Sequence, residues 1–240
     1  MRKALFFSLI VSLILSATAT AQVGLSASGA SKNRSDTKEI MNQFLKGIKK
    51  NEDASDNIDG TPYLKDDFLP AMLIFPENQP LQGMVRYNVA KEEMQIRIDE
   101  DGYRVLHPDV VVEFNNQPYK MMYYRGEDKT MDLIGYFEVL SPKQEDGVQL
   151  LRKHRKFVRR GRAAAAMQRA EPPKYVDKDD FYLKFGDAKP VMVETRTKKF
   201  IKLFPEEDQK EIKKFMKEND LKAKNRQDLL AVVHHYNKLS

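Results

Sequence analysis

Residues 83–98 read GMVRYNVAKEEMQIRI, and this stretch decides the fold class. It contains two short apolar runs separated by a polar turn, and in the second run Met94, Ile96 and Ile98 alternate with polar residues. A period of two is expected when one face of a β-strand is buried and the other face meets water. The stretch therefore predicts two strands that pair as a β-hairpin.

The same rhythm of short apolar runs and turn residues continues from residue 63 to residue 158. Gly, Pro, Asn and Asp separate the runs, as is typical of turns between strands. The connections are too short for crossover helices, so neighbouring strands are expected to run antiparallel. We therefore expect a β-rich α+β fold in which an antiparallel meander closes into a small barrel, a half-barrel or a sandwich. The expected strands are residues 70–75, 83–89, 94–98, 103–106, 110–114, 119–124, 133–140 and 148–158.

The last part of the chain favours a hairpin followed by helices. Residues 181–185 and 191–194 are apolar runs that flank a turn containing Gly and Pro. Apolar residues then recur at helical spacing within residues 212–216 and 229–236. We expect two to three helices at this end of the chain.

The first residues have the three parts of a cleavable signal peptide. Arg2 and Lys3 precede a mostly apolar run over residues 4–15, and small residues follow that run. The apolar run is shorter than the roughly 20 residues needed to cross a bilayer. We expect cleavage between Ala21 and Gln22, and a periplasmic or secreted location for the protein that remains.

These patterns divide the chain into five parts. The segment after the signal peptide is expected to be polar and flexible, and Ile40, Phe44, Leu45 and Ile48 in it are spaced for one face of a short helix. A second polar segment, rich in basic residues, Ala and Pro, follows the expected strands. The expected parts are a signal peptide over 1–21, a flexible segment over 22–59, an antiparallel β domain over 60–158, a linker over 159–180, and a hairpin plus helical unit over 181–240.

The composition limits the chemistry open to the chain. It contains no cysteine, which excludes disulfides, thiol nucleophiles, a lipid-carrying cysteine and cysteine-ligated metals. The formal net charge is +6, and it falls to +4 once the two basic residues of the signal peptide are removed. This mild excess is not by itself a nucleic-acid signature. No later apolar run approaches about 18 residues, so we expect no transmembrane segment in the mature protein.

Short motifs in the chain resemble those of a group of exported Bacteroidetes proteins. The sequence has RYN at residues 86–88, EM at residues 93–94, GYFEVL at residues 135–140, and the pair Tyr236-Asn237 near its end. The group carries a similar RYN…EM β-hairpin and a helical C-terminal tail, and it has no assigned activity. The resemblance implies a Gram-negative envelope address and a β-rich fold, and it carries over no catalytic residue.

The sequence contains no convincing catalytic, metal or cofactor motif. The G-x-S-x-G, P-loop and dinucleotide-binding patterns are absent. His234 and His235 are neighbours on an expected helix, so their side chains diverge by about 100°, and no other histidine has an evident partner. Residues 55–66 match a calcium loop only in part, because the first and twelfth positions lack the expected ligands. We therefore expect no catalytic, cofactor-binding or metal-binding residues.

The feature least like an average sequence is the basic stretch, residues 152–169, which has eight basic residues, one histidine and no acid. If it forms a strand, both faces are basic, which suits an edge strand because charged edges resist strand addition. The structural interpretation is therefore edge protection followed by a solvated linker. The functional interpretation is a patch that binds an anionic envelope component, such as lipid headgroups or lipopolysaccharide phosphates, or an acidic protein. The patch residues are Arg152, Lys153, Arg155, Lys156, Arg159, Arg160 and Arg162.

From these observations we expect a noncatalytic envelope protein that acts as a binding or protein-interaction module. The alternative is a periplasmic carrier of an apolar or amphipathic ligand, because a half-barrel lined by Leu, Met and Tyr could hold an acyl chain. An unrecognised hydrolase is the third hypothesis. Nucleic acid is not an expected partner, because the signal peptide removes the protein from the cytoplasm.

Overall fold

The structure is a computed structural model, and it describes residues 39, 43–50, 58–76, 78–98, 102–114, 116–126, 131–143, 147–163 and 170–239. The chain divides into two compact units, Met1–Glu39 and Ile40–Ser240. All described residues except Glu39 belong to the second unit. The expected signal peptide and its cleavage site at Ala21 and Gln22 lie outside the described residues, so both stay predictions.

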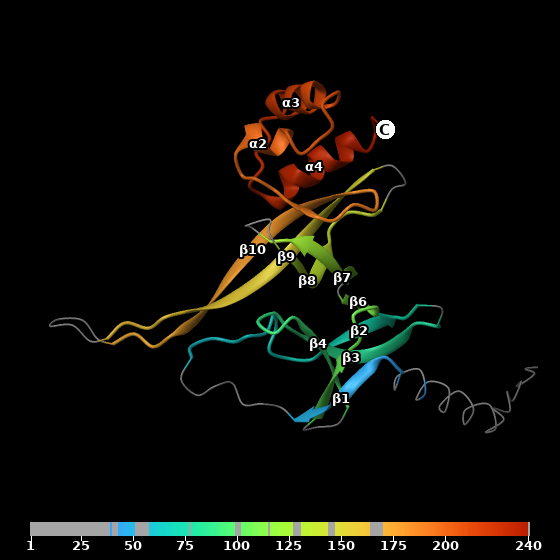
Figure 1. Ribbon diagram of the computed structural model, residues 1–240, viewed down its shortest axis with the longest axis vertical. Helices are drawn as coiled ribbons and strands as arrows, with labels where there is room; N and C mark the ends of the chain where they lie inside the picture. Colours follow the sequence, from blue (N-terminus) through green and yellow to red (C-terminus); the bar gives the residue numbers. More distant parts are fainter. Residues whose placement is uncertain are drawn as a thin grey trace, which may run out of the picture. The chain divides into compact units, whose positions relative to one another are not determined.

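The described strands form one sheet in which every strand pair is antiparallel (Figure 1). The order across the sheet is β1-β5-β4-β3-β2-β6-β7-β8-β9-β10-β11. Most neighbours in the sheet are also neighbours in the sequence, because short turns connect them. The predicted β-rich, antiparallel fold is confirmed. The strands are β1 (Leu45–Lys50), β2 (Leu69–Ile74), β3 (Leu81–Asn88), β4 (Glu93–Arg97), β5 (Gly102–Leu106), β6 (Val111–Phe114), β7 (Gln117–Arg125), β8 (Asp132–Val139), β9 (Val148–Arg159), β10 (Lys174–Phe185) and β11 (Val191–Met192).

The hairpin of β3 and β4 has the buried face that its sequence pattern predicts. Val85 lies opposite Ile96 across the hairpin, and Tyr87 lies opposite Met94. All four side chains are at most 3% exposed and belong to one core cluster. Burying a side chain of this size stabilises a fold by about 1.5–3 kcal/mol relative to leaving it in water. This cluster therefore fixes the register of the first half of the sheet.

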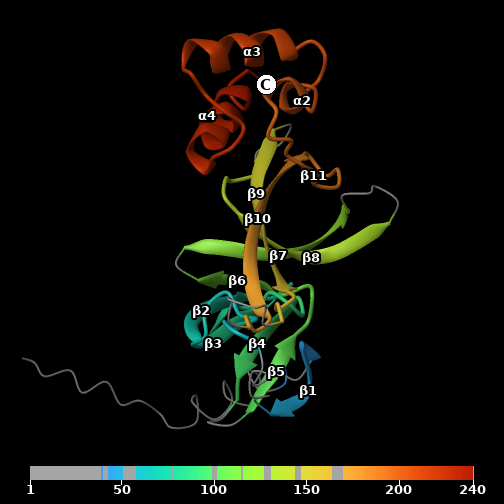
Figure 2. The same ribbon diagram turned by 90° about the vertical axis from the view of Figure 1, so that its left-hand side faces the viewer.

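Strands β9 and β10 form a long hairpin that corrects two expectations. Their pairing runs without a break from Val148 opposite Phe185 to Arg159 opposite Lys174 (Figure 2). Residues 174–180, which we assigned to a linker, are the first part of β10, because their side chains complement those of β9 across the ladder. Nor is β9 an edge strand, since it lies between β8 and β10.

The N-terminal segment corrects another expectation. Leu45 and Ile48, which the spacing of apolar residues assigned to a short helix, lie in strand β1 instead. This strand pairs with β5, where Leu45 lies opposite Leu106. Phe44 and Leu45 pack against the core cluster of the sheet. Tertiary packing overrides the helical spacing here, because isolated short helices are only marginally stable.

Helices follow the last strand, as predicted. They are α2 (Thr197–Ile201), α3 (Gln209–Glu218) and α4 (Arg226–Tyr236), and they lie together beside one end of the β9–β10 hairpin (Figure 1). Their apolar side chains share a core cluster with Leu150 of β9 and Leu183 of β10. None of the helices in the described part of the chain is both long and apolar enough to cross a membrane.

Both ends of α4 are held by asparagine side chains. Asn225 caps the N-terminus by accepting a hydrogen bond of 2.9 Å from the backbone N–H of Asp228. After the last turn, the Asn237 side chain accepts a hydrogen bond from the Val148 N–H at 2.7 Å and donates one to the Val148 carbonyl oxygen at 2.9 Å. The helical unit is thereby tied to the first residue of β9.

Candidate functional site

The basic stretch lies on β9, directly opposite an acidic stretch on β10. In the register of the hairpin, Lys156 faces Asp177, His154 faces Asp179, and Lys153 faces Asp180. Opposite charges on facing strands attract, and each such pair adds roughly 0.2–1 kcal/mol. The basic residues of the expected patch therefore lie opposite acidic residues of the same hairpin.

Ion pairs engage most of the residues that we assigned to the patch. The Arg152 guanidinium lies 2.6 Å from the Glu138 carboxylate of β8, and Lys156 Nζ lies 2.8 Å from the Asp177 carboxylate. Farther along the hairpin, Arg155 pairs with Asp180, and both Arg159 and Arg162 approach Glu171 at 3.8 Å. Of the seven patch residues, only Arg160 has no ion pair with a described residue.

Lys153 is the residue that departs most from a docking role. Its side chain is 1% exposed, and its ammonium group pairs with the Glu92 carboxylate, which reaches it from the β3–β4 turn. The Glu92 carboxylate also accepts hydrogen bonds from the Tyr87 hydroxyl at 2.8 Å and from the Tyr136 backbone N–H at 2.9 Å. Burial lowers the pKa of Lys153, and the neighbouring Glu92 charge opposes that shift. Lys153 is thus a buried structural cation.

Two backbone features make room for this buried pair. Glu92 has a φ of 53°, a left-handed conformation that is uncommon for a residue with a side chain. Gly135 lies beneath the Lys153 side chain, and a Cβ atom at this position would collide with the ammonium group. The pair therefore combines local backbone strain in the turn with a glycine in β8, where a larger residue would force the Lys153 ammonium group to move.

His154 has two partners, which corrects the expectation that no histidine outside the C-terminal pair has one. Its Nδ1 lies 2.8 Å from the Asp179 carboxylate, and its Nε2 lies 3.0 Å from the Glu138 carboxylate. Burial acts to lower the pKa of His154, but the hydrogen bonds to both carboxylates outweigh it and raise the pKa. Because both ring nitrogens are engaged, His154 in this arrangement offers no lone pair to a metal or a substrate.

The carboxylates around His154 respond in the opposite direction. Hydrogen bonding to His154 is the main cause that lowers the pKa of Asp179. Burial acts to raise the pKa of Glu138, but hydrogen bonds from His154 and Arg152 outweigh it and lower the pKa. All the groups are therefore held in their charged forms. The cluster stabilises the junction of β8, β9 and β10 and leaves little positive charge exposed.

Unpaired positive charge is found instead on the helical unit. A groove of about 910 Å³ lies along α2, α3 and the turn after α3, and exposed lysines surround it. Of its apolar lining residues, Ile201 and Met216 are almost fully buried, at 8% and 2% exposed, and Leu221 is half-buried. We call it the lysine groove, and its lysines are Lys198, Lys202, Lys210, Lys213, Lys217 and Lys222.

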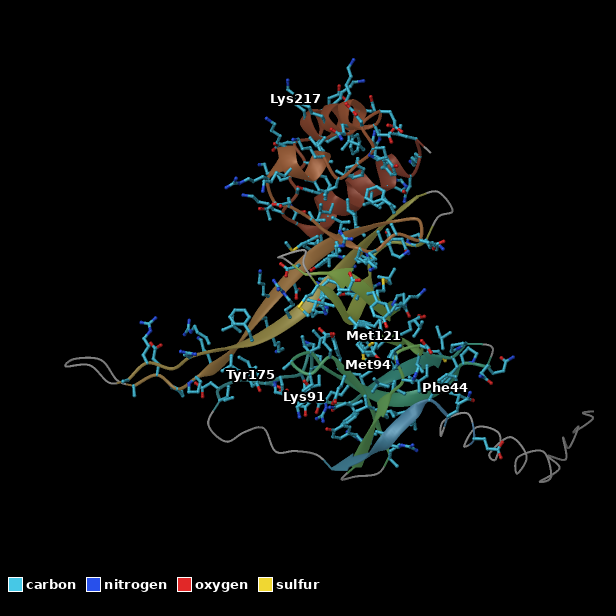
Figure 3. The ribbon with its side chains drawn as sticks, in the orientation of Figure 1. Phe44, Lys91, Met94, Met121, Tyr175 and Lys217 are labelled. Carbon is cyan, nitrogen blue, oxygen red and sulfur yellow. The ribbon has the colours of Figure 1, made fainter. Side chains whose placement is uncertain are left out.

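The lysines of this groove have almost no acidic partners. Within the described part of the chain, Lys222 alone among them forms an ion pair, with Asp220 at 3.6 Å. Lys210, Lys213 and Lys217 recur at intervals of three and four on α3, so they lie on one helix face. Figure 3 shows Lys217 on α3, away from the sheet. Like charges at these spacings destabilise a helix by a few tenths of a kcal/mol, about 0.2–0.5 per pair, so an anion bound here would relieve repulsion.

The lysine groove is not evident from the sequence because its lysines are dispersed. They occur over residues 198–222, mixed with acids such as Glu206, Glu207 and Glu218, so no basic run marks them. The available signal was the spacing of Lys210, Lys213 and Lys217 on a predicted helix. The connection between α2 and α3 then brings two further lysines to the same groove.

No family model, no curated protein and no solved structure matches this chain. The described residues also contain no group of three or more His, Asp or Glu side chains that could hold a metal ion. The geometry of the two basic regions is therefore the basis for assigning a function.

Proposed function

We propose that this protein is a noncatalytic interaction module that binds an acidic, amphipathic segment of a partner protein in the lysine groove. The observation that carries the proposal is the contrast in pairing: five of the six groove lysines have no ion pair within the described residues. A surface with several unpaired cations attracts and orients an anionic partner.

The apolar part of the groove favours a peptide segment over a small anion. Half-buried Leu221 and the methylene chains of the lysines supply its accessible apolar surface, above the almost buried Ile201 and Met216. An amphipathic helix binds such a groove by placing apolar side chains at intervals of three and four on the apolar surface. Acidic side chains flanking that stripe would then meet the surrounding lysines.

The expected location of the protein outside the cytoplasm supports the same class of function. If residues 1–21 direct export, as their pattern indicates, the partner is an acidic protein of the periplasm or of the exterior, and nucleic acid is excluded. The resemblance to exported Bacteroidetes proteins implies the same location in the envelope. Charge complementarity of this kind increases association rates and gives a strong dependence on salt.

The test is equilibrium binding of a designed probe. A fluorescein-labelled peptide of about four helical turns, with Leu on one face and Glu on the other, is titrated with the protein and followed by fluorescence anisotropy. We expect binding that weakens by about tenfold or more in the variant Lys202→Gln/Lys213→Gln/Lys217→Gln, a loss of about 1.4 kcal/mol or more. Raising the ionic strength from about 0.1 M to about 1 M, which shortens the Debye length from about 10 Å to about 3 Å, should also weaken binding.

The matched control removes three exposed lysines elsewhere in the chain. Lys120→Gln/Lys174→Gln/Lys238→Gln changes the net charge by the same amount at positions remote from the groove in sequence. We expect this variant to bind the peptide like the unsubstituted protein. Equal losses in the two variants would show that only net charge matters, and the proposal would be wrong.

A further inference from the structure

Strand β8 has an open edge over its first part. On one side it pairs with β7 from Asp132 to Glu138. On the other side it pairs with β9 at Glu138 and Val139 only. Beyond this short contact β9 leaves β8 and continues as a hairpin with β10 (Figure 2). In the described part of the chain, no strand therefore pairs with residues 132–137 on the side away from β7.

The backbone groups at this edge are identified by the direction of the Tyr136 N–H. It donates a hydrogen bond of 2.9 Å to the Glu92 carboxylate, so it points away from β7. Residues of an antiparallel strand direct their N–H and carbonyl groups to alternate sides, and the β7–β8 register runs without a shift from Tyr136 to Asp132. The N–H and carbonyl groups of Ile134 and Asp132 therefore point away from β7 as well. Within the described residues, these groups have no hydrogen-bond partner.

The open edge continues a ladder that the fold already uses. The Leu140 N–H donates a hydrogen bond of 2.9 Å to the Leu150 carbonyl oxygen, so β9 occupies this side of the chain at the end of β8. At Tyr136, the Glu92 carboxylate stands where a backbone carbonyl of an antiparallel neighbour would accept the hydrogen bond. The next two positions of the ladder have no neighbour among the described residues. The edge therefore has the backbone geometry to pair with one more extended segment.

The side chains along this edge are apolar and exposed. Leu133 is 40% exposed and Ile134 43%, and as consecutive residues they lie on opposite faces of the strand. Tyr123, which lies opposite Ile134 on β7, is 63% exposed. Asp132, the charged residue at the start of β8, is neutralised by Lys189, whose Nζ lies 2.6 Å from its carboxylate. Lysine and proline commonly protect sheet edges from strand addition, and β8 contains neither, so the edge is both unpaired and apolar.

We propose that an extended, apolar segment of a partner protein binds at this edge as an additional strand, antiparallel to β8. Strand addition is a recurring mode of peptide recognition, in which main-chain hydrogen bonds give affinity and side chains give specificity. The backbone groups of Ile134 and Asp132 supply the hydrogen bonds. Because Leu133 and Ile134 lie on opposite faces, the segment that fits has consecutive apolar side chains, one beside each of them. The site shares no residue with the lysine groove and goes beyond the function proposed above.

The residues of the edge favour a separate segment over a second copy of this chain. Pairing two copies of β8 by twofold symmetry sets Asp132 opposite either Asp132 or Ile134 of the other copy, which places a charge against a like charge or against an apolar side chain. The remaining register sets Asp132 opposite Tyr136, whose N–H already donates to Glu92. An uncharged segment avoids all three conflicts.

The test uses two peptides with identical side chains. The probe is a fluorescein-labelled peptide with the sequence Ser-Thr-Val-Ile-Val-Thr-Ser, and the control is the same peptide with every amide of its apolar run N-methylated. Both are titrated with the protein and followed by fluorescence anisotropy. We expect the control to bind about tenfold more weakly or less, because methylation removes the N–H groups that a strand donates to its neighbour. Equal binding of the two peptides would overturn the proposal.

Substitution of one backbone donor tests the same site from the side of the protein. Ile134→Pro removes the outward N–H of the open edge and leaves the hydrogen bonds between β7 and β8 in place. We expect it to weaken binding of the probe by about tenfold or more. The matched control Ile134→Val keeps both the N–H and an apolar side chain, and it should bind the probe like the unsubstituted protein.

Hydrogen exchange of the unsubstituted protein gives a readout that does not depend on how Ile134→Pro folds. The probe should slow exchange of the Ile134 and Asp132 amides by about tenfold or more, since each then donates to the added strand. Exchange of these amides at the same rate with and without the probe would overturn the proposal, as would a dimer in sedimentation that Ile134→Pro dissociates. Lys202→Gln/Lys213→Gln/Lys217→Gln should bind this apolar probe normally, so failure of the lysine-groove function would be recognised separately.

Discussion

The basic stretch on β9 and the lysine groove on the helical unit contain similar numbers of cationic residues but use them in opposite ways. On β9, the cations lie opposite the acids of β10, and one of them, Lys153, is almost fully buried. On the helical unit, the lysines surround an open groove, and within the described residues Lys222 alone has an acidic partner. A dense run of charge in a sequence is therefore not the same as a charged surface.

The difference follows from how neighbouring side chains are arranged in a β-hairpin and in a helix. In an antiparallel hairpin, each residue has a fixed opposite, so a basic strand followed by an acidic strand neutralises itself. In a helix, residues three and four apart share a face, so Lys210, Lys213 and Lys217 add their charges although acids separate them in the sequence. Burial then makes the paired cations structural, because a buried charge without a partner is costly.

The largest effect is expected from removing the buried cation of the basic stretch on β9. Lys153→Met removes the cation and leaves the Glu92 carboxylate without its ion-pair partner, so the free energy of unfolding should fall by about 3 kcal/mol. Urea unfolding measures the change. The double variant Glu92→Gln/Lys153→Met should recover part of the loss, because both charges are then absent. A loss below about 0.5 kcal/mol, the range of ordinary surface substitutions, would contradict the assignment of Lys153 to the core.

A smaller effect is expected from pH at the His154 cluster. The pKa of His154 is raised above its ordinary value of 6.5, so its contribution to stability is complete below about pH 6.5 and is lost as pH rises through the folded-state pKa. The pKa values of Glu138 and Asp179 are lowered, so their contributions are present above their ordinary values of 4.5 and 3.8 and are lost in acid. The Tm of the wild-type protein should therefore fall as the pH rises from about 6.5 through the folded-state pKa of His154.

The variant His154→Gln isolates this effect. Below the folded-state pKa of His154 this variant should be less stable than the wild-type protein, and the loss of stability above pH 6.5 that comes from His154 should disappear. The readout is the slope of Tm against pH and not the Tm itself. Parallel slopes in the two proteins would show that His154 is not held in its charged form by Asp179 and Glu138.

The smallest expected effect concerns the lysine groove. Lys213→Gln/Lys217→Gln removes like-charge repulsion on α3, so the stability of the protein should stay constant or rise by a few tenths of a kcal/mol. The same urea titration measures it. A loss of about 1 kcal/mol or more would show that these lysines have a structural role, as those of β9 do.

The sequence predicted the fold class well where the pattern was local. The alternation in residues 94–98 marked β4, and the hairpin of residues 181–194 and the helices after it were expected from turn and stripe signals. The prediction of a helix that includes Ile48 was wrong, because this segment pairs with β5 as a strand. The linker expected over 159–180 was wrong at Arg159, which ends β9, and over residues 174–180, because complementary side chains on β9 extend β10 back to Lys174.

The candidate sites were less predictable because they depend on contacts between segments that are distant in the sequence. The basic stretch was visible, but its partners are distant in the sequence. Glu92 lies in the β3–β4 turn and Glu138 on β8, and their approach depends on the register of the sheet. The lysine groove was hidden because three elements contribute to it. Residue spacing identifies one face of one element, and only the fold determines which faces meet.

The most direct test of the contrast between the two basic regions compares two sets of substitutions in the same assays. The groove set is Lys202→Gln/Lys213→Gln/Lys217→Gln, and the hairpin set is Arg155→Gln/Lys156→Gln/Arg159→Gln/Arg160→Gln. Each variant is measured for affinity toward the acidic amphipathic peptide and for its urea midpoint. We predict that the groove set loses about tenfold or more in affinity and keeps its midpoint, while the hairpin set keeps its affinity and unfolds at lower urea. The reverse pattern, with affinity lost in the hairpin set and kept in the groove set, would contradict this account.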